Sequence, residues 1–389
     1  MVRARNDLPV VVAGGGIGGL AAALFLRKAG LDATVYEQAA EVREVGAGIV
    51  VAPNMVRPLA ALGLVENLEK FAVRLEAAWE FRRWQDGRVL FVQPMGEECE
   101  RRFGAHCYVA HRADLLALLQ QALPPEQIRL DHRCIEVRQN NQVEILFANG
   151  KTVEADIVIG ADGIHSVVRP LVASVEARFS GLSAFRCLVP ADKAPEMALR
   201  PVQTLWLGPG RHFVHYPISG GRLVNIVAIV AGEWRDESWT AKGSVADLAA
   251  AFAGWDERVL RLIASTTSTT RWAMFDRDPL ERWTAGRVTL LGDAAHAMLP
   301  FFAQGAAQAI EDAVVLADCL KDADAASVPQ ALKRYEEIRL PRTSKVQVMS
   351  RGREIRNHLP DGPDQQQRDA QLANGDPLRD SAWLYGPLP

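Results

Sequence analysis

Near its N-terminus the sequence carries a glycine pattern that could bind the phosphates of a dinucleotide. The pattern Gly14-x-Gly16-x-x-Gly19 follows an apolar run and precedes an apolar, helix-like segment. The first glycine permits a tight turn, the second lets the backbone approach a pyrophosphate, and the third lets the helix pack closely on the strand. Glu37, 21 residues after Gly16, could accept hydrogen bonds from ribose hydroxyls. We predict a dinucleotide site that disfavours a 2′-phosphate, with FAD and NAD both possible at this point.

A second motif, Leu-Gly-Asp-Ala-Ala-His at residues 291–296, places Asp293 at the end of an apolar run. Its carboxylate could hold a sugar-like hydroxyl, although an ordinary loop capped by aspartate is the structural alternative. Gly305 opens a long apolar helix predicted at 304–320. The free N–H groups and positive end of such a helix would stabilise the negative charge of a reduced flavin.

A third motif, Asp162-Gly163, follows the apolar run that begins at Val158, and Ser166 stands near the start of a predicted helix. Asp162 could be only a turn former. Its position at a strand end beside the first motif predicts a cofactor contact.

The elements that must position these motifs alternate between strands and helices. Buried strands are predicted at 8–13, 33–37 and 287–291 and a helix at 20–30, whereas 178–231 contains mostly strands, clearest at 203–207, 211–218 and 223–230. Asp86-Gly87 and Asn149-Gly150 predict hairpins with type I′ turns. The last 35 residues, with Pro360 and Pro363, are predicted to be an irregular tail.

Together these elements predict an α/β protein: a Rossmann-like nucleotide-binding domain of discontinuous segments with an inserted, mainly β domain. We assign residues 1–72, 106–177 and 273–350 to the first domain, 73–105 and 178–272 to the second, and 351–389 to the C-terminal tail.

Composition limits the possible partners. The chain has 389 residues, of which 49% are hydrophobic and 23% charged, with a net charge of −3, so nucleic acid and anionic membrane are not expected partners. No apolar run approaches the roughly 20 residues that span a bilayer. The five cysteines are scattered without C-x-x-C spacing, which favours a reducing cytoplasm over a disulfide framework or a zinc site. We expect no metal, and a monomer or homodimer.

The three motifs, in this order and at these separations, resemble the class A flavoprotein monooxygenases, which have the para-hydroxybenzoate hydroxylase fold. The resemblance extends from residue 8 to about 385, and residues 46–49 and Pro53-Asn54 resemble the family's loop beside the flavin ring. It implies tightly bound FAD, with NADH or NADPH as a transient reductant. The FAD contacts that it implies are Gly14, Gly16, Gly18, Gly19, Glu37, Gly48, Arg112, Asp162, Asp293, Gly305 and Ala306.

Within that family the chain resembles the salicylate hydroxylase, 3-hydroxybenzoate 6-hydroxylase and 6-hydroxynicotinate 3-monooxygenase subgroup. The resemblance includes His212 and Tyr216, the closing His358-Leu-Pro360 and residues 383–385. Residues four apart on a strand share one face, so His212 and Tyr216 can enter one pocket while His215 faces away. In the latter two relatives this pair contacts the substrate, and it implies here that His212 deprotonates a phenol, whose anion is the more electron-rich nucleophile. A His and a Tyr satisfied on a half-buried strand is the alternative.

The pocket positions differ from those of these relatives. The hydroxynicotinate enzymes have histidines at the positions of Val50 and Phe301 and a cysteine at that of Gln203, and the 3-hydroxybenzoate enzyme has a glutamine at that of Pro300. These differences favour a salicylate-like hydroxybenzoate by elimination. Arg186 is a candidate carboxylate anchor, although we expect a surface arginine, and His296 is expected to be a structural loop residue.

The resemblance therefore implies an enzyme: an FAD-dependent aromatic hydroxylase that uses NAD(P)H and O2 and acts on a small phenolic acid through a flavin C4a-hydroperoxide. Three alternatives remain open from the sequence. They are a flavin-dependent dehydrogenase or reductase on the same fold, a hydroxynicotinate-type monooxygenase, and a flavin-binding protein without catalysis.

Overall fold

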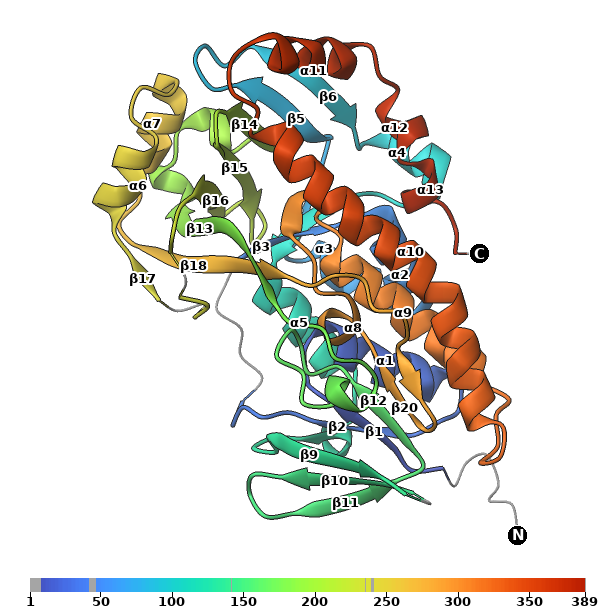
Figure 1. The fold of residues 1–389 in the computed structure, drawn as a ribbon. Coiled ribbons are helices and arrows are strands. Elements are labelled where there is room, and N and C mark those ends of the chain that lie inside the picture. The colour runs from blue at the N-terminus through green and yellow to red at the C-terminus, as the bar shows by residue number, and fades with distance from the viewer. Residues whose placement is uncertain (1–7, 42–46, 141, 235, 239–240, 389) are drawn as a thin grey trace.

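The structure is a computed structural model that describes residues 8–41, 47–140, 142–234, 236–238 and 241–388 (Figure 1). One end of the molecule is built on a six-stranded sheet in the order β19-β20-β12-β1-β2-β8. All neighbours in this sheet are parallel except β19 and β20. Its strands are β1 Val10–Ala13, β2 Ala33–Tyr36, β8 Ile128–Arg129, β12 Ile157–Gly160, β19 Thr284–Ala285 and β20 Val288–Leu290.

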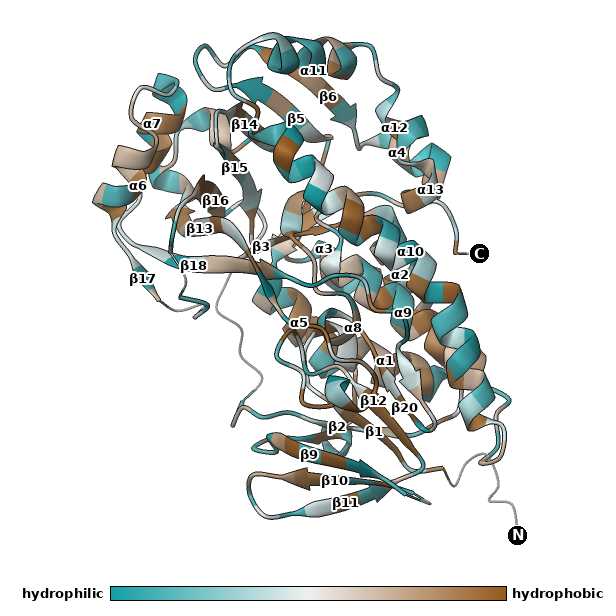
Figure 2. Ribbon diagram, in the orientation of Figure 1, coloured by the Kyte–Doolittle hydropathy of each residue, from teal (hydrophilic) through white to brown (hydrophobic). Residues whose placement is uncertain are grey.

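The central strands β1, β12 and β20 are buried along their whole length, and they appear as apolar ribbons in Figure 2. Their Val, Ile and Leu side chains pack with α1 Ile17–Lys28 and α9 Gly305–Leu320 into one core. A sheet covered on both faces needs such uninterrupted apolar strands. The core therefore fixes the strand ends from which the glycine, Asp-Gly and Gly-Asp motifs emerge.

The other end is an eight-stranded sheet in the order β17-β18-β13-β16-β15-β14-β5-β6. Two of its strands come from the segment 73–105 and six from the segment that begins at 178, with β18 extending past residue 272. The domain bounds themselves stay a prediction. The strands are β5 Ala77–Arg83, β6 Val89–Pro94, β13 Arg178–Pro190, β14 Val202–Gly208, β15 Arg211–Ile218, β16 Leu223–Ala231, β17 Lys242–Gly243 and β18 Thr269–Asp276.

Two three-stranded sheets complete the β structure. One, β11-β10-β9, lies beside the six-stranded sheet, and the other, β3-β7-β4, packs through β7 against β15. Their strands are β3 Gly48–Val51, β4 Val73–Arg74, β7 Tyr108–His111, β9 Cys134–Gln139, β10 Val143–Phe147 and β11 Thr152–Ala155. The remaining helices are α2 Pro53–Ala61, α3 Val65–Glu69, α4 Glu97–Phe103, α5 Arg112–Gln121, α6 Val245–Ala251, α7 Glu257–Ala264, α8 Asp293–His296, α10 Val328–Asn357, α11 Pro363–Ala373, α12 Pro377–Asp380 and α13 Ala382–Tyr385.

The prediction of an irregular C-terminal tail is wrong. The 30-residue helix α10 runs along the molecule from the six-stranded sheet toward the eight-stranded sheet, and α11, α12 and α13 follow it (Figure 1). Pro363 and Pro377 are the first residues of α11 and α12. At that position the missing N–H of proline breaks no helical hydrogen bond, so these prolines begin helices instead of preventing them.

Two smaller predictions are also corrected. Both hairpins form, but only Gly87 and Gly150 have positive φ, whereas a type I′ turn needs positive φ at both central residues. After Asp162-Gly163 no α-helix follows. Ser166 instead lies before the short 3-10 turn Arg169–Leu171, whose first N–H donates to Ser166 Oγ at 2.9 Å.

Candidate functional site

A cavity of about 500 Å³ runs from the N-terminus of α1 to strands β14 and β15. It lies where the motif-bearing ends of the six-stranded sheet meet one face of the eight-stranded sheet. Most of the residues predicted for cofactor and substrate line it: Gly16, Gly18, Gly48, Val50, Arg112, Gln203, His212, Tyr216, Asp293, Pro300, Phe301, Gly305 and Ala306. Four of the predicted residues, Gly14, Gly19, Glu37 and Asp162, are not part of the wall.

The glycine loop at the start of α1 has the shape needed to hold a phosphate. Gly14 has φ +111°, and a Cβ on Gly19 would collide with the carbonyl oxygen of Gly14. A Cβ on Gly16 would meet nothing within 4 Å, because that position opens onto the cavity. Glu37 accepts hydrogen bonds from the N–H groups of Gly15 at 2.7 Å and Ala39 at 2.9 Å. These contacts hold its carboxylate against the loop, where remaining lone pairs can face a ribose.

The opposite wall is formed by α8 and the N-terminus of α9. Asp293 is exposed at the first residue of α8, and Gly305 and Ala306 line the cavity at the first turn of α9. The first N–H groups of a helix have no partner within the helix and carry partial positive charge. This wall therefore offers a carboxylate for hydroxyl groups and a positive helix end for an anionic ring. Gly46, the first residue of the loop that the resemblance places beside the flavin ring, lies outside the described residues.

Asp162 has a local structural role. Its Oδ2 accepts hydrogen bonds from the backbone N–H groups of Val167 at 2.7 Å and Val168 at 3.2 Å. Burial raises the pKa of Asp162. The neighbouring residues Gly163 and Ile164 reach the cavity. A cofactor contact by the Asp162 side chain thus stays a prediction.

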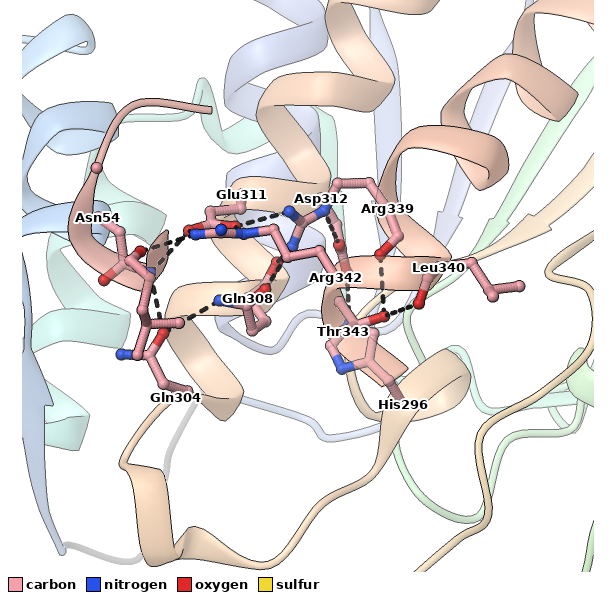
Figure 3. Close-up of polar contacts among 12 residues, drawn as sticks. Asn54, His296, Gln304, Gln308, Glu311, Asp312, Arg339, Leu340, Arg342 and Thr343 are labelled. Atoms are coloured by element: carbon pink, nitrogen blue, oxygen red, sulfur yellow. Dashed lines mark hydrogen bonds and ion pairs between the residues drawn. The ribbon is translucent and has the colours of Figure 1, made fainter. Parts of the chain in front are cut away.

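A buried ionic network stands behind the α8–α9 wall (Figure 3). Arg339 of α10 donates from Nε to Asp312 Oδ1 and from Nη1 to Glu311 Oε2, each at 2.7 Å, and all three side chains are fully buried. Asp312 Oδ2 also contacts His296 Nε2 at 2.6 Å and accepts from the N–H of Gly292 at 3.1 Å. Burial alone would raise the pKa of Asp312, but His296 and Arg339 beside it lower that pKa below its usual value.

The network reaches two further parts of the site. Asn54 of α2 donates to Glu311 Oε1 at 2.7 Å and to Gln304 Oε1 at 2.9 Å, just before α9 begins. Arg342 pairs with Glu311 and donates to the carbonyl oxygens of Trp383 and Leu384 near the C-terminus. The interpretation of His296 as a structural residue agrees with this geometry, because its Nε2 is committed to Asp312.

At the other end of the cavity, His212 and Tyr216 of β15 line the wall, while His215 faces the opposite side. There His215 Nε2 accepts a hydrogen bond from Trp206 Nε1 at 3.2 Å. Burial, with a smaller effect of His358, holds the pKa of His212 well below its usual value, and burial raises the pKa of Tyr216. His212 is therefore neutral near pH 7 and able to accept a proton.

Two residues near the substrate end differ from what the sequence indicated. Arg186 of β13 lines the cavity with its guanidinium 3.9 Å from the centre of the Trp272 ring, so the expectation of a surface arginine is wrong. Its place between apolar residues on both sides, in the run 184–189, was the available signal. His358, at the end of α10, contacts His212 Nδ1 at 2.7 Å. Because 146 positions separate the two histidines, no local pattern pairs them.

These residues fit FAD. The glycine cradle, the open position at Gly16, Asp293 and the N-terminus of α9 lie along one cavity, and residues of β14 and β15 line its far end. Within the described ranges, no group of three His, Cys, Asp or Glu side chains is placed to hold a metal ion. Nor does any helix in the described part of the chain have the length and apolar character needed to cross a membrane.

Comparisons with known proteins agree with this geometry. A family model described as an FAD binding domain matches residues 7–350. A 3-amino-4-hydroxybenzoate 2-monooxygenase of Streptomyces platensis is 46% identical over 389 residues, covering 99% of this chain and 98% of the relative. HpxO of Klebsiella pneumoniae, solved with FAD and uric acid, has a TM-score of 0.87 at 29% identity, and a salicylate hydroxylase substrate complex has 0.82 at 30%. Each alignment covers 99% of both chains.

Proposed function

The chain belongs to the FAD binding domain family and is an FAD-dependent aromatic monooxygenase that uses NAD(P)H, and from that premise we propose that its substrate is a benzoate carrying adjacent hydroxyl and amino groups. The observation that carries this proposal is Gln203. Its side chain is 4% exposed, lines the cavity, and has an Oε1 without a hydrogen-bond partner among the described residues. A buried amide needs hydrogen-bond partners, and a polar ring substituent bound in the cavity beside Gln203 would supply one.

The neighbouring strands place the other polar groups beside Gln203. Thr204 of β14 pairs with His215 of β15, so the adjoining Gln203 and Tyr216 come side by side on the cavity face. In this proposal Gln203 accepts from the amino group, and Tyr216 and His212 receive the adjacent hydroxyl. The amino and hydroxyl groups stand on neighbouring ring carbons, and the residues that would bind them stand on the neighbouring strands β14 and β15.

Arg186 supplies the remaining recognition. Its guanidinium, stacked on Trp272, carries a positive charge in a mainly apolar cavity wall. A planar guanidinium matches a carboxylate with two parallel hydrogen bonds. We assign Arg186 as the anchor of the substrate carboxylate, which orients the ring so that its hydroxyl faces β15.

The reaction named for the Streptomyces platensis relative explains why an amino contact matters. In 3-amino-4-hydroxybenzoate, C2 is ortho to the amino group and meta to the hydroxyl, so the amino nitrogen is the group that activates C2. Bound FAD, reduced by NADH or NADPH, supplies the activation of O2. A hydrogen bond from the amino N–H to Gln203 holds that nitrogen in place, and the neutral His212 accepts the proton of the hydroxyl.

A substrate panel tests the proposal. Holoenzyme is assayed for NADH and NADPH oxidation, oxygen uptake and product mass with 3-amino-4-hydroxybenzoate, 4-hydroxybenzoate, salicylate, 3-hydroxybenzoate and 6-hydroxynicotinate. We expect the amino-hydroxybenzoate to have the highest kcat/KM and to gain one oxygen atom. A salicylate-like monohydroxybenzoate is the second candidate, favoured by the likeness to the salicylate hydroxylase substrate complex. A higher kcat/KM for salicylate, or for 6-hydroxynicotinate, would overturn the amino-group proposal.

We also infer a reducing compartment such as the cytoplasm, because all five cysteines are free in the structure. A monomer or homodimer stays a prediction, to be measured by light scattering of the purified holoenzyme.

A further inference from the structure

Two histidines from distant parts of the chain are joined beside the cavity. His212 Nδ1 lies 2.7 Å from His358 Nε2, and the ring centroids are 4.9 Å apart. His212 is 2% exposed and lines the cavity, whereas His358 is half-buried at the end of α10. The pair therefore connects the cavity to the partly exposed end of α10.

The contact is held in place by the backbone and by an aromatic ring. The N–H of Gly210, in the turn between β14 and β15, donates to the carbonyl oxygen of His358 at 3.0 Å. Phe301 packs against both imidazoles, with centroid distances of 5.4 Å to His212 and 6.0 Å to His358. This anchoring fixes the end of α10 against the strand that carries His212.

We infer that His358 is the outer member of a two-histidine proton relay between the substrate hydroxyl and solvent, an inference that rests on the proposed role of His212. Since Nδ1 of His212 is engaged by His358, Nε2 is the nitrogen left for the substrate. The tautomer with hydrogen on His212 Nδ1, donating to His358 Nε2, leaves the Nε2 lone pair free to accept.

The proton balance of the relay closes. The substrate O–H bond breaks and its proton binds His212 Nε2, while the Nδ1 proton of His212 moves to His358 Nε2 and the Nδ1 proton of His358 passes to water. The electron pair of the broken bond stays on the substrate oxygen, so the ring becomes a phenolate and one proton leaves the protein. The same path in reverse returns a proton to the product hydroxyl and restores both tautomers.

The lowered pKa values of the two histidines favour passing the proton on over holding it on either ring. Burial lowers the pKa of His358 to about 4 and holds that of His212 well below its usual value, so neither imidazole retains a proton near neutral pH. Charged groups on the surrounding elements are directed to other partners. Arg211 donates to the Ala251 carbonyl, Arg353 lies over the Phe302 ring, Asp361 pairs with Arg83, and Glu354 interacts with Arg178, Asp276 and Arg351.

Proton release tests the relay directly. Holoenzyme is mixed with 3-amino-4-hydroxybenzoate, or with salicylate if only salicylate is hydroxylated, in weak buffer containing a pH indicator, and release is followed by stopped flow. We expect His358→Ala to slow proton release about 10-fold or more, with unchanged FAD content. Added imidazole should restore the rate in proportion to its unprotonated concentration. His215→Ala, which removes a buried histidine facing away from the cavity, is the matched control.

His358→Gln keeps the size and polarity of the residue but cannot relay a proton, so it should be slow and insensitive to imidazole. Wild-type release rates in a His358→Gln variant that binds FAD and substrate normally would overturn the relay, as would a His358→Ala variant that imidazole does not rescue. If His212→Ala alone slows release, the relay is wrong and the proposed function stands. If wild-type enzyme hydroxylates nothing in the panel, the proposed function itself fails.

Discussion

At the scale of single residues, a substitution of Gln203 tests whether the substrate carries an amino group. Replacing Gln203 with Leu removes the amide and introduces an apolar side chain of similar size. We expect kcat/KM for 3-amino-4-hydroxybenzoate to fall about 5- to 150-fold, since an amino group without its acceptor costs roughly 1–3 kcal/mol. The kcat/KM for 4-hydroxybenzoate, which has no amino group, should stay unchanged or rise.

Thr204→Val provides the control for that experiment. Thr204 is the next residue of β14, and its hydroxyl faces Glu80 instead of the cavity. Its replacement should leave the ratio of the two kcat/KM values unchanged. An equal loss for both substrates in Gln203→Leu would indicate a general packing defect and would contradict the assignment of Gln203 to the amino group.

The low pKa of His358 also has a consequence for stability. Its folded-state pKa, about 4, lies below the unfolded value of roughly 6.5. The contribution of neutral His358 to the unfolding free energy is fully present above about pH 6.5 and is lost as pH falls toward 4. The reason is that the unfolded chain binds a proton at this residue at a higher pH than the folded protein does. Between pH 7 and pH 5 the unfolding free energy of the wild type should fall about 2 kcal/mol more than that of His358→Gln. The unfolding free energies of both proteins are measured by urea titration at pH 7 and pH 5. An equal fall in the two proteins would contradict this expectation.

At the scale of elements, helix α9 joins the cofactor wall to the ionic network. In Asp312→Asn an amide would replace the carboxylate that accepts from Arg339, Gly292 and His296. Breaking a buried ion pair typically costs 3–5 kcal/mol, so we expect a comparable loss in unfolding free energy and faster FAD dissociation, followed by flavin fluorescence. Asp318→Asn, on the exposed face of the same helix, should change neither. Normal FAD retention in Asp312→Asn would show that the ionic network does not stabilise FAD binding.

The elements that the sequence predicted well are those with strong local patterns. The prediction at 211–218 matches β15, and 304–320 differs from α9 by one residue. The prediction of an irregular tail is wrong because the helices of the tail have weak apolar patterns, and because Pro363 begins α11. Its helical state depends on packing against β6, to which α11 and α12 are adjacent.

The sequence predicted the site residues that belong to local motifs. It did not predict those that enter the site through contacts between distant segments. The glycine loop, Asp293 and the β15 pair lie along one cavity, as strand and helix geometry predicted. Arg186 enters that cavity because β13 belongs to the eight-stranded sheet, and His358 reaches His212 because α10 ends beside β15. Both depend on contacts across the whole chain, which a single sequence does not encode in any local spacing.

At the scale of the whole molecule, Arg342 ties the C-terminal segment to the centre of the protein. It pairs with Glu311 and holds the carbonyl oxygens of Trp383 and Leu384. Arg342→Met should therefore lower the unfolding free energy by about 3 kcal/mol and increase proteolysis after residue 360. Arg379→Met, at an exposed position of the same C-terminal segment, should leave both unchanged. Full protease resistance in Arg342→Met would show that the helices α11–α13 are held by other contacts.

Helix α10, with 30 residues and therefore a length of about 45 Å, reaches from Arg339 in the ionic network to Asn357 in the cavity wall, with His358 directly after it. The family model ends at residue 350, but the alignment with the Streptomyces platensis relative covers 99% of this chain. One rod thus serves both ends of the cavity: its middle supports the cofactor wall through Arg339, and its last residues reach the substrate end. Exchanging the last turns of this rod between relatives would then be a route to new substrate chemistry that keeps Arg339 in its network.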